Sequence, residues 1–202
     1  MTSPAPRRGR PPASTREALE EVAFDLLLRD GYEATTVQAI MQAGNVGRTT
    51  FFRYFGSKGG IVWGEFDRAV ERLRDSLRAA DDAPVLTAIK NAIVESTRLS
   101  KAASPEAWLD RFHVMDRDPS LTAETARHWS DWANEISSYV EDRTGISAAA
   151  PRVAAIGGAV QAAYVAVLRD WSERPLSMNV DIAELDEHLT PLCAALQLTL
   201  EP

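Results

Sequence analysis

Residues 35–58, TTVQAIMQAGNVGRTTFFRYFGSK, constrain the fold of this chain more than any other stretch. Short segments with helical spacing of apolar residues stand on either side of Gly44-Asn45, and both of these residue types tolerate a positive φ angle. Gly56 and Ser57 then separate the two segments from a longer helical pattern. Two short helices joined by a tight turn form a helix-turn-helix, which lays its second helix in the DNA major groove. The sequence therefore predicts a DNA-binding head followed by a longer body.

Local signals place the helices of this head. Residues 1–13 are rich in proline and arginine, which is typical of a flexible arm. Ser14 with Glu17 is a capping-box pattern that predicts the start of the first helix, and Gly31 predicts its end. Thr36 is the expected cap of the second helix. The third helix is expected over about 47–54 and a long fourth helix over about 58–80.

The remainder of the chain also has a helical pattern throughout. Four prolines each precede a stretch of helical periodicity, as first-turn prolines do, and strand alternation is absent from the sequence pattern. We expect further helices over roughly 84–100, 105–115, 119–143, 151–173 and 181–199. The prediction is an all-α protein of about nine helices, divided into a basic arm (1–13), a helix-turn-helix domain (14–60) and an effector-binding and dimerisation domain (61–202).

The charge is distributed unevenly between these parts. The net charge is −7 over 202 residues, but residues 1–58 carry eight basic and six acidic side chains, so the excess negative charge belongs to the body. DNA attracts such a head weakly and repels such a body. We expect no apolar run long enough to cross a bilayer, and the first residues do not resemble a signal-peptide core. We therefore expect a cytoplasmic protein.

The order of helix, GYEATTV, turn, RTTFFRYFGSK and long helix resembles the tetracycline-repressor (TetR) family of one-component bacterial regulators. This resemblance covers roughly residues 14–62. It implies a homodimer in which three amino-terminal helices bind DNA and the later helices hold an effector pocket and the dimer interface. Three positions depart from the family pattern, because Asn45, Gly47 and Phe52 replace a usual glycine, serine and tyrosine.

The third helix carries the side chains that a recognition helix needs. Arginine can bridge guanine O6 and N7, and threonine methyl groups can pack on thymine. Phe51 and Phe55, four residues apart, are expected to pack inward. Phosphate contacts are expected at the edges of the element, including the positive end of the second helix. The predicted base contacts are Arg48, Thr49 and Thr50, and the predicted phosphate contacts are Thr35, Thr36, Arg53, Tyr54 and Lys58.

The basic arm adds a second DNA-binding hypothesis. Arg8-Gly9-Arg10-Pro11 resembles the core of an AT-hook, whose arginines enter a narrow minor groove. An unstructured tail that makes loose phosphate contacts explains the same residues equally well, and the sequence does not separate the two.

Aromatic residues recur at helical spacing through the body. Their default role is core packing, but aromatic walls with a few polar groups also form ligand pockets. Four polar side chains are candidates to bind an anionic head group: Arg111, His113, His128 and Arg169. Metal-ligand spacing, catalytic triads and phosphate-binding glycine loops are absent from the sequence pattern, and we expect no cofactor. The predicted ligand-binding residues are Trp63, Phe66, Trp108, Phe112, Met115, Trp129, Trp132, Tyr164 and Arg169.

The last two helices are the expected dimer seam. Residues 152–168 are nearly continuous in small and apolar side chains, and Gly157 and Gly158 allow close helix approach. A leucine-rich face follows on the final helix. Such a dimer would fit two half-sites of a palindromic operator.

The sequence leaves three interpretations of the body open. The segments WGEFDRAVERLR and RFHVMDRDPSL resemble a subgroup of the family that includes mycofactocin-linked regulators, which implies a fatty acyl or acyl-CoA effector for a repressor. A drug-responsive regulator of an efflux gene is the alternative, and a dimeric DNA-binding protein without an effector is another. A cavity lined by tryptophans would favour a sensor, and a filled body would favour the effector-free protein.

Overall fold

Helices make up all the regular secondary structure in the part of the chain that the computed structural model describes, residues 15–80, 82–105, 107–174 and 180–200. The all-α prediction is therefore confirmed. The described helices are α1 (Arg16–Asp30), α2 (Val37–Ala43), α3 (Arg48–Phe55), α4 (Gly59–Arg78), α5 (Val85–Ala103), α6 (Trp108–Arg117), α7 (Thr122–Thr144), α8 (Pro151–Glu173) and α9 (Ile182–Gln197), with short 3-10 turns η1 (Pro119–Leu121) and η2 (Leu198–Leu200).

Threonine side chains start the first two helices. Thr15 Oγ1 accepts a hydrogen bond from the Ala18 amide at 3.1 Å, and Thr36 Oγ1 accepts from Ala39 at 3.0 Å. The predicted cap Thr36 is confirmed. The first cap is Thr15 and not the neighbouring Ser14, which lies outside the described residues.

The turn between α2 and α3 depends on one residue. Asn45 has a φ of 50°, in the left-handed region that asparagine tolerates better than most side chains. Gly44, predicted to share this role, has an ordinary φ of −82° and simply ends α2. Asn45 at the usual glycine position is therefore compatible with the turn.

The body helices follow the predicted pattern with local shifts. Helix α8 has the predicted bounds, whereas α5 continues three residues further, to Ala103. Pro119 opens η1 and not α7, because Asp118 accepts hydrogen bonds from the amide and hydroxyl of Ser120 and shapes a separate turn.

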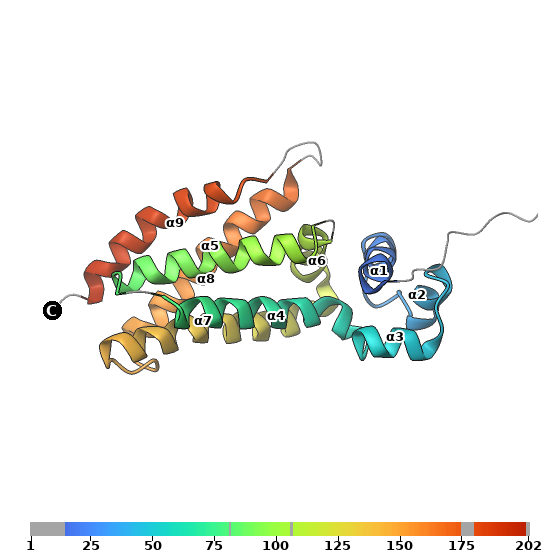
Figure 1. The fold of residues 1–202 in the computed structure, drawn as a ribbon, viewed down its shortest axis with the longest axis horizontal. Coiled ribbons are helices and arrows are strands. Elements are labelled where there is room, and N and C mark those ends of the chain that lie inside the picture. Colours follow the sequence, from blue (N-terminus) through green and yellow to red (C-terminus); the bar gives the residue numbers. More distant parts are fainter. Residues whose placement is uncertain (1–14, 81, 106, 175–179, 201–202) are drawn as a thin grey trace, which may run out of the picture.

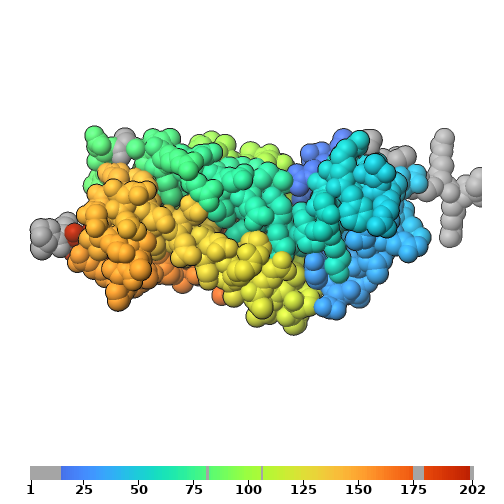
Figure 2. Space-filling view, turned by 90° about the horizontal axis from the view of Figure 1, so that it is seen from below, coloured from blue at the N-terminus to red at the C-terminus, as the bar shows by residue number. Residues whose placement is uncertain are grey.

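Helices α1, α2 and α3 lie together at one end of the molecule (Figure 1). Helix α4 leads from α3 into the body and packs against α5, α6 and α7. Helix α6 also contacts α1, and the space-filling view shows the α2–α3 end continuing directly into the body (Figure 2). The domain boundary that we predict after residue 60 falls within the first turn of α4.

Helix α8 is an apolar helix of the core. Its 23 residues are long and apolar enough to span a bilayer by length and composition, which corrects the expectation that no such run exists. The helix packs against α6, α7 and α9, and Val153, Ile156 and Val160 on it are fully buried or nearly so. In this apolar window 39% is buried, so packing within the protomer accounts for only one side of the helix.

Candidate DNA-binding face and ligand cavity

Helix α3 buries one side and exposes the other. Phe51 is fully buried and Phe55 nearly so, with their ring centroids 5.5 Å apart on the side that faces the core. Arg48 and Thr49 are exposed at the start of the helix, and Thr50 is half-buried. Gly47 provides no side-chain cap, as expected from its departure from the family pattern. The face predicted to read bases is therefore accessible.

Aromatic rings hold two arginines at this outer face. The Arg48 guanidinium lies over the Phe52 ring at 5.0 Å, and the Arg53 guanidinium lies over the Tyr54 ring at 5.0 Å. Cation–π contacts of this kind favour a charge that remains at the surface. Phe52, which lacks the hydroxyl of the usual tyrosine, thus positions Arg48.

The two adjacent threonines have different roles. Thr36 is exposed at the amino end of α2, and its hydroxyl hydrogen remains available to an acceptor such as a phosphate. Thr35 is only 2% exposed, and its hydroxyl contacts the carbonyls of Gly31 at 2.8 Å and Leu26 at 3.3 Å. The prediction that Thr35 contacts DNA is therefore wrong, because its side chain fastens the α1–α2 loop.

Lys58 is also directed into the protein. Its Nζ donates to the carbonyls of Tyr32 at 2.7 Å and Thr35 at 3.1 Å, and it lies 4.1 Å from the centroid of the Tyr32 ring. This half-buried ammonium joins the start of α4 to the α1–α2 loop. The structure thus gives Lys58 a structural role as a clamp, and its predicted phosphate contact stays a prediction. The predicted arm residues Arg8 and Arg10 lie outside the described residues.

The body contains a small cavity where the predicted ligand residues converge. Seven of the nine predicted residues line it, contributed by four helices. Glu65, Ala69, Ser100, Arg111 and Leu168 complete the lining. The seven are Phe66, Trp108, Phe112, Met115, Trp129, Trp132 and Tyr164.

Ring contacts order the apolar wall of this cavity. Trp132 stacks on Tyr164 with centroids 5.2 Å apart, and Trp129 meets both rings edge-on at 5.9 Å. The Tyr164 hydroxyl lies 2.9 Å from Thr97 Oγ1, and burial raises the pKa of Tyr164 to about 12. This phenol therefore stays protonated at neutral pH and offers hydrogen bonding without charge.

The free volume of the cavity is about 60 Å³. Sites for drug-sized ligands measure roughly 300–1,000 Å³. This volume is several-fold smaller than such sites. A larger ligand requires the surrounding helices to separate.

Trp63 does not line this cavity. It is 5% exposed and stacks on His128 with the ring centroids 4.1 Å apart, which ties α4 to α7. Burial and the neighbouring Arg127 lower the pKa of His128, against the opposing effect of Asp67. The structure therefore places the Trp63 ring in the α4–α7 contact and outside the small cavity.

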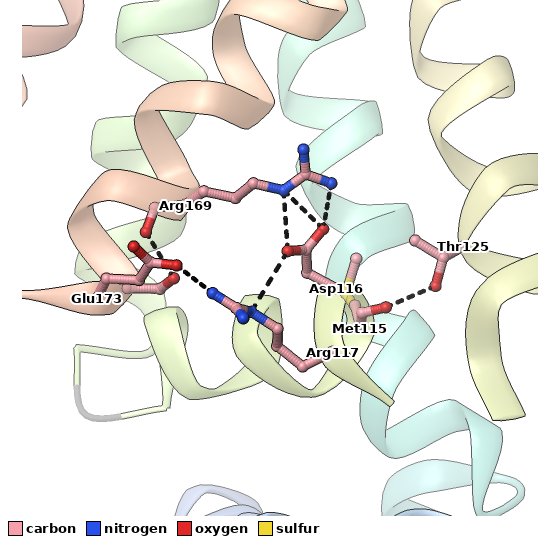
Figure 3. A network of polar contacts seen from close by, with 7 residues as sticks. Met115, Asp116, Arg117, Thr125, Arg169 and Glu173 are labelled. Atoms are coloured by element: carbon pink, nitrogen blue, oxygen red, sulfur yellow. Dashed lines mark hydrogen bonds and ion pairs between the residues drawn. The ribbon is translucent and has the colours of Figure 1, made fainter. Parts of the chain in front are cut away.

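Arg169 is exposed and does not line the small cavity, but it lines a neighbouring surface pocket that shares Met115 and Trp129 with it. Its guanidinium binds both carboxylate oxygens of Asp116 at 2.7–3.0 Å, which joins α8 to α6 (Figure 3). Arg117 extends this network to Glu173. The structure thus pairs Arg169 with an acidic side chain 53 residues earlier, outside the small cavity, and its contact with an anionic ligand stays a prediction.

Three polar side chains, Glu65, Ser100 and Arg111, also line the cavity. Sequence reasoning named Arg111 only as a candidate and missed Glu65 and Ser100. Burial alone would raise the pKa of Glu65, but hydrogen bonds from Arg72 and Arg68 outweigh it and hold the pKa below its usual value. The spacing of these arginines after Glu65 was a usable signal of an intrahelical ion-pair network.

Metal binding has no support in the described part of the chain, where no three histidine, cysteine, aspartate or glutamate side chains come together as a site. The cavity lining combines aromatic rings, charged side chains and a neutral phenol.

Two family descriptions match the chain. Residues 20–62 match "Bacterial regulatory proteins, tetR family", and residues 83–197 match "MftR C-terminal domain". A protein of Mycobacterium tuberculosis provisionally named mycofactocin biosynthesis transcriptional regulator MftR is 27% identical over 139 residues, which are 69% of this chain and 70% of that protein.

Solved structures share the fold. A TetR-family regulator from Syntrophomonas wolfei has a TM-score of 0.63 at 19% identity, covering 91% of this chain and 94% of that chain. Thermus thermophilus FadR, a TetR-family repressor solved in complex with lauroyl-CoA, has a TM-score of 0.54 at 20% identity, covering 89% and 93%. At these identities the likeness establishes the fold alone.

Proposed function

This chain belongs to the TetR family of bacterial regulatory proteins and carries an MftR-type C-terminal domain, and we propose that it is a homodimeric repressor that a small hydrophobic effector releases from operator DNA. Regulators of this family are DNA-binding proteins and not enzymes. They work in the cytoplasm, where we also place this chain. The observation that carries the proposal is the exposed face of α3 above its buried phenylalanines.

We assign base contacts to Arg48, Thr49 and Thr50, and phosphate contacts to Thr36, Arg53 and Tyr54. The exposure of Arg48 and Arg53 supports this assignment, as do the rings that hold their guanidinium groups outward. Phosphate contacts set the register, and base contacts select the sequence.

Binding-site selection with the purified full chain tests the DNA-binding face, because it needs no prior operator. We expect a palindrome, and we expect Arg48→Ala to cost about 1–3 kcal/mol on the selected site and to relax the preference at one base pair per half-site. Arg78→Ala, which removes an exposed arginine from α4, is the matched control and should leave the selected sequence unchanged. Selection of the same palindrome by Arg48→Ala would refute the assignment.

We propose that the dimer forms through the outer face of α8. Ala154, Ala155, Ala162 and Ala166 are exposed there, and small side chains permit close helix approach. Gly157, one of the two glycines predicted at the seam, instead faces Ala133 and Ser137 of α7 in the same protomer. The predicted leucine face of α9 is also used partly within the protomer, where Leu185 and Leu189 are buried.

We propose that the effector is a fatty acyl compound or its CoA thioester. The apolar, aromatic lining of the cavity supports this class, and the bound lauroyl-CoA of the Thermus protein is a precedent within the fold. The cavity lining favours a sensor over the effector-free reading, although the small volume requires the helices to open. A drug effector is the competing proposal.

Effector binding would act by population shift. Phe66 on α4 lines the cavity, and α4 begins directly after the Lys58 clamp that holds the α1–α2 loop. A ligand that separates α4 from α7 would therefore change the position of the DNA-binding end, and it shifts the equilibrium only by its difference in affinity for the two states. Failure of laurate and lauroyl-CoA to raise the melting temperature or to dissociate the operator complex would refute the acyl proposal.

A further inference from the structure

One residue belongs both to the cavity wall and to the contact with the DNA-binding end. Arg111 on α6 lines the cavity, and its Nη2 forms an ion pair with Glu20 on α1. Its guanidinium also lies over the Phe24 ring at 5.3 Å. Arg111 and Glu20 are 4% and 3% exposed, so this pair between α1 and α6 is withdrawn from solvent.

Further charges surround this pair. Glu65 on α4 accepts from Arg68 at 2.6 Å and from Arg72 at 2.7 Å, and Arg72 also contacts Ser100 on α5 at 3.2 Å. Glu65 and Ser100 line the cavity together with Arg111. We call Glu20, Glu65, Arg68, Arg72 and Arg111 the junction cluster. It contains three guanidinium groups and two carboxylates, so it has one excess positive charge.

Two buried guanidinium nitrogen atoms of the cluster lack a hydrogen bond: Arg68 Nη2, which keeps its ion pair with Glu65, and Arg111 Nε. Arg111 Nε is buried and has no hydrogen-bond partner among the described residues. A buried donor without a partner costs about 1–3 kcal/mol, more when it is charged. The guanidinium fork matches a carboxylate, which can accept two parallel hydrogen bonds from it.

We propose that the cavity takes an apolar ligand that ends in a carboxylate, and that this carboxylate binds Arg111 in competition with Glu20. The proposal rests on the proposed effector function and deepens it by naming the charged group and its receptor. Aromatic walls receive the apolar part, and the ligand charge balances the junction cluster. The Arg111–Glu20 pair weakens when the ligand binds, which releases α1 from α6.

This competition couples the two sites directly. If the ligand weakens a contact that holds α1 in its DNA-binding position, DNA binding must weaken ligand binding by the same factor. Loss of Glu20 as a competitor should therefore tighten carboxylate binding and remove most of its effect on DNA. A neutral ligand of the same shape lacks the charge that displaces Glu20.

The experiment compares laurate with 1-dodecanol and 2-naphthoate with 2-naphthol, with binding followed by quenching of the cavity tryptophans. The wild-type chain should bind each carboxylate about 10- to 100-fold more tightly than its matched alcohol, as a charged hydrogen bond predicts. Arg111→Gln should lose this preference and keep its affinity for the alcohol. Arg169→Gln removes an arginine from the surface network with Asp116 and should behave as the wild type.

Two further variants keep the proposal testable if Arg111→Gln fails to fold. The double variant Glu20→Gln/Arg111→Gln replaces the ion pair with two neutral amides and should show no carboxylate preference. Glu20→Gln alone should bind carboxylates several-fold more tightly, and its operator affinity should respond little to them. Carboxylate preference that persists in the double variant would overturn the proposal.

The ligand pairs separate this proposal from the acyl effector. If 2-naphthoate binds through Arg111 and neither laurate nor lauroyl-CoA binds, the acyl proposal fails and the carboxylate site stands. If laurate and 1-dodecanol bind equally in the wild type and in Arg111→Gln, the acyl class stands and the carboxylate site fails. If none of the four compounds binds, the carboxylate site fails, and the acyl proposal fails with it if lauroyl-CoA also does not bind.

Discussion

The Lys58 clamp gives a prediction that separates folding from DNA contact. Lys58→Met keeps most of the aliphatic stem and removes the ammonium that donates to Tyr32 and Thr35 at 2.7 and 3.1 Å. A charged hydrogen bond contributes about 1.5–3 kcal/mol, and water can replace part of this at a half-buried position. We therefore expect a loss of about 2 kcal/mol in the free energy of unfolding, or roughly 4–8 °C in melting temperature.

The assay pairs differential scanning calorimetry with the salt dependence of operator binding. Each phosphate contact contributes about 0.9 to the slope of log affinity against log salt. Arg53→Met, at an exposed position on α3, should lower this slope and leave the melting temperature near that of the wild type. Lys58→Met should lower the melting temperature and leave the slope unchanged. The clamp is refuted if Lys58→Met lowers the slope as Arg53→Met does and melts at the wild-type temperature.

Substitutions at three other positions test separate contacts. Gly157→Ala should destabilise the fold by about 1–3 kcal/mol in urea titrations. The new Cβ would lie 2.7 Å from the Ala133 carbonyl oxygen, which cannot move aside. Equal or higher stability would show that α7 and α8 have room to separate. Thr36→Ala should cost about 1 kcal/mol through the lost cap of α2, and Thr36→Ser should restore it, whereas equal urea midpoints for all three proteins would contradict the cap. The pKa of His128 lies below its usual value of 6.5, so the unfolded state takes up the proton first as the pH falls. Stability should therefore decrease from about pH 7.5 to pH 5.5 more steeply in the wild type than in His128→Gln, and parallel melting curves would rule this out.

The head of the molecule was largely predictable because local rules determine it. The four-residue spacing of Phe51 and Phe55 identified them as the inner face of α3, and capping chemistry identified Thr36. Local rules do not distinguish Thr35 from Thr36. The loop after α1 folds back so that the Thr35 hydroxyl contacts the carbonyls of Leu26 and Gly31, and sequence spacing does not reveal this fold-back.

The cavity was predictable in its apolar part and not in its charged part. Aromatic residues at helical spacing must face inward, so seven of nine predicted residues meet at the cavity. The partner of a charged side chain depends on the packing of distant helices. Arg169 meets Asp116 from 53 residues away and Arg111 meets Glu20 from 91 residues away, separations at which sequence spacing carries no signal.

The central claim is that filling the aromatic cavity lowers the affinity for operator DNA. Fluorescence anisotropy of the selected palindrome, titrated with the protein at one fixed salt concentration, measures this directly in the absence and presence of saturating laurate or lauroyl-CoA. We expect the dissociation constant for the operator to rise at least about tenfold when the ligand is bound. An unchanged dissociation constant, while quenching of the cavity tryptophans shows the ligand in place, would contradict the account.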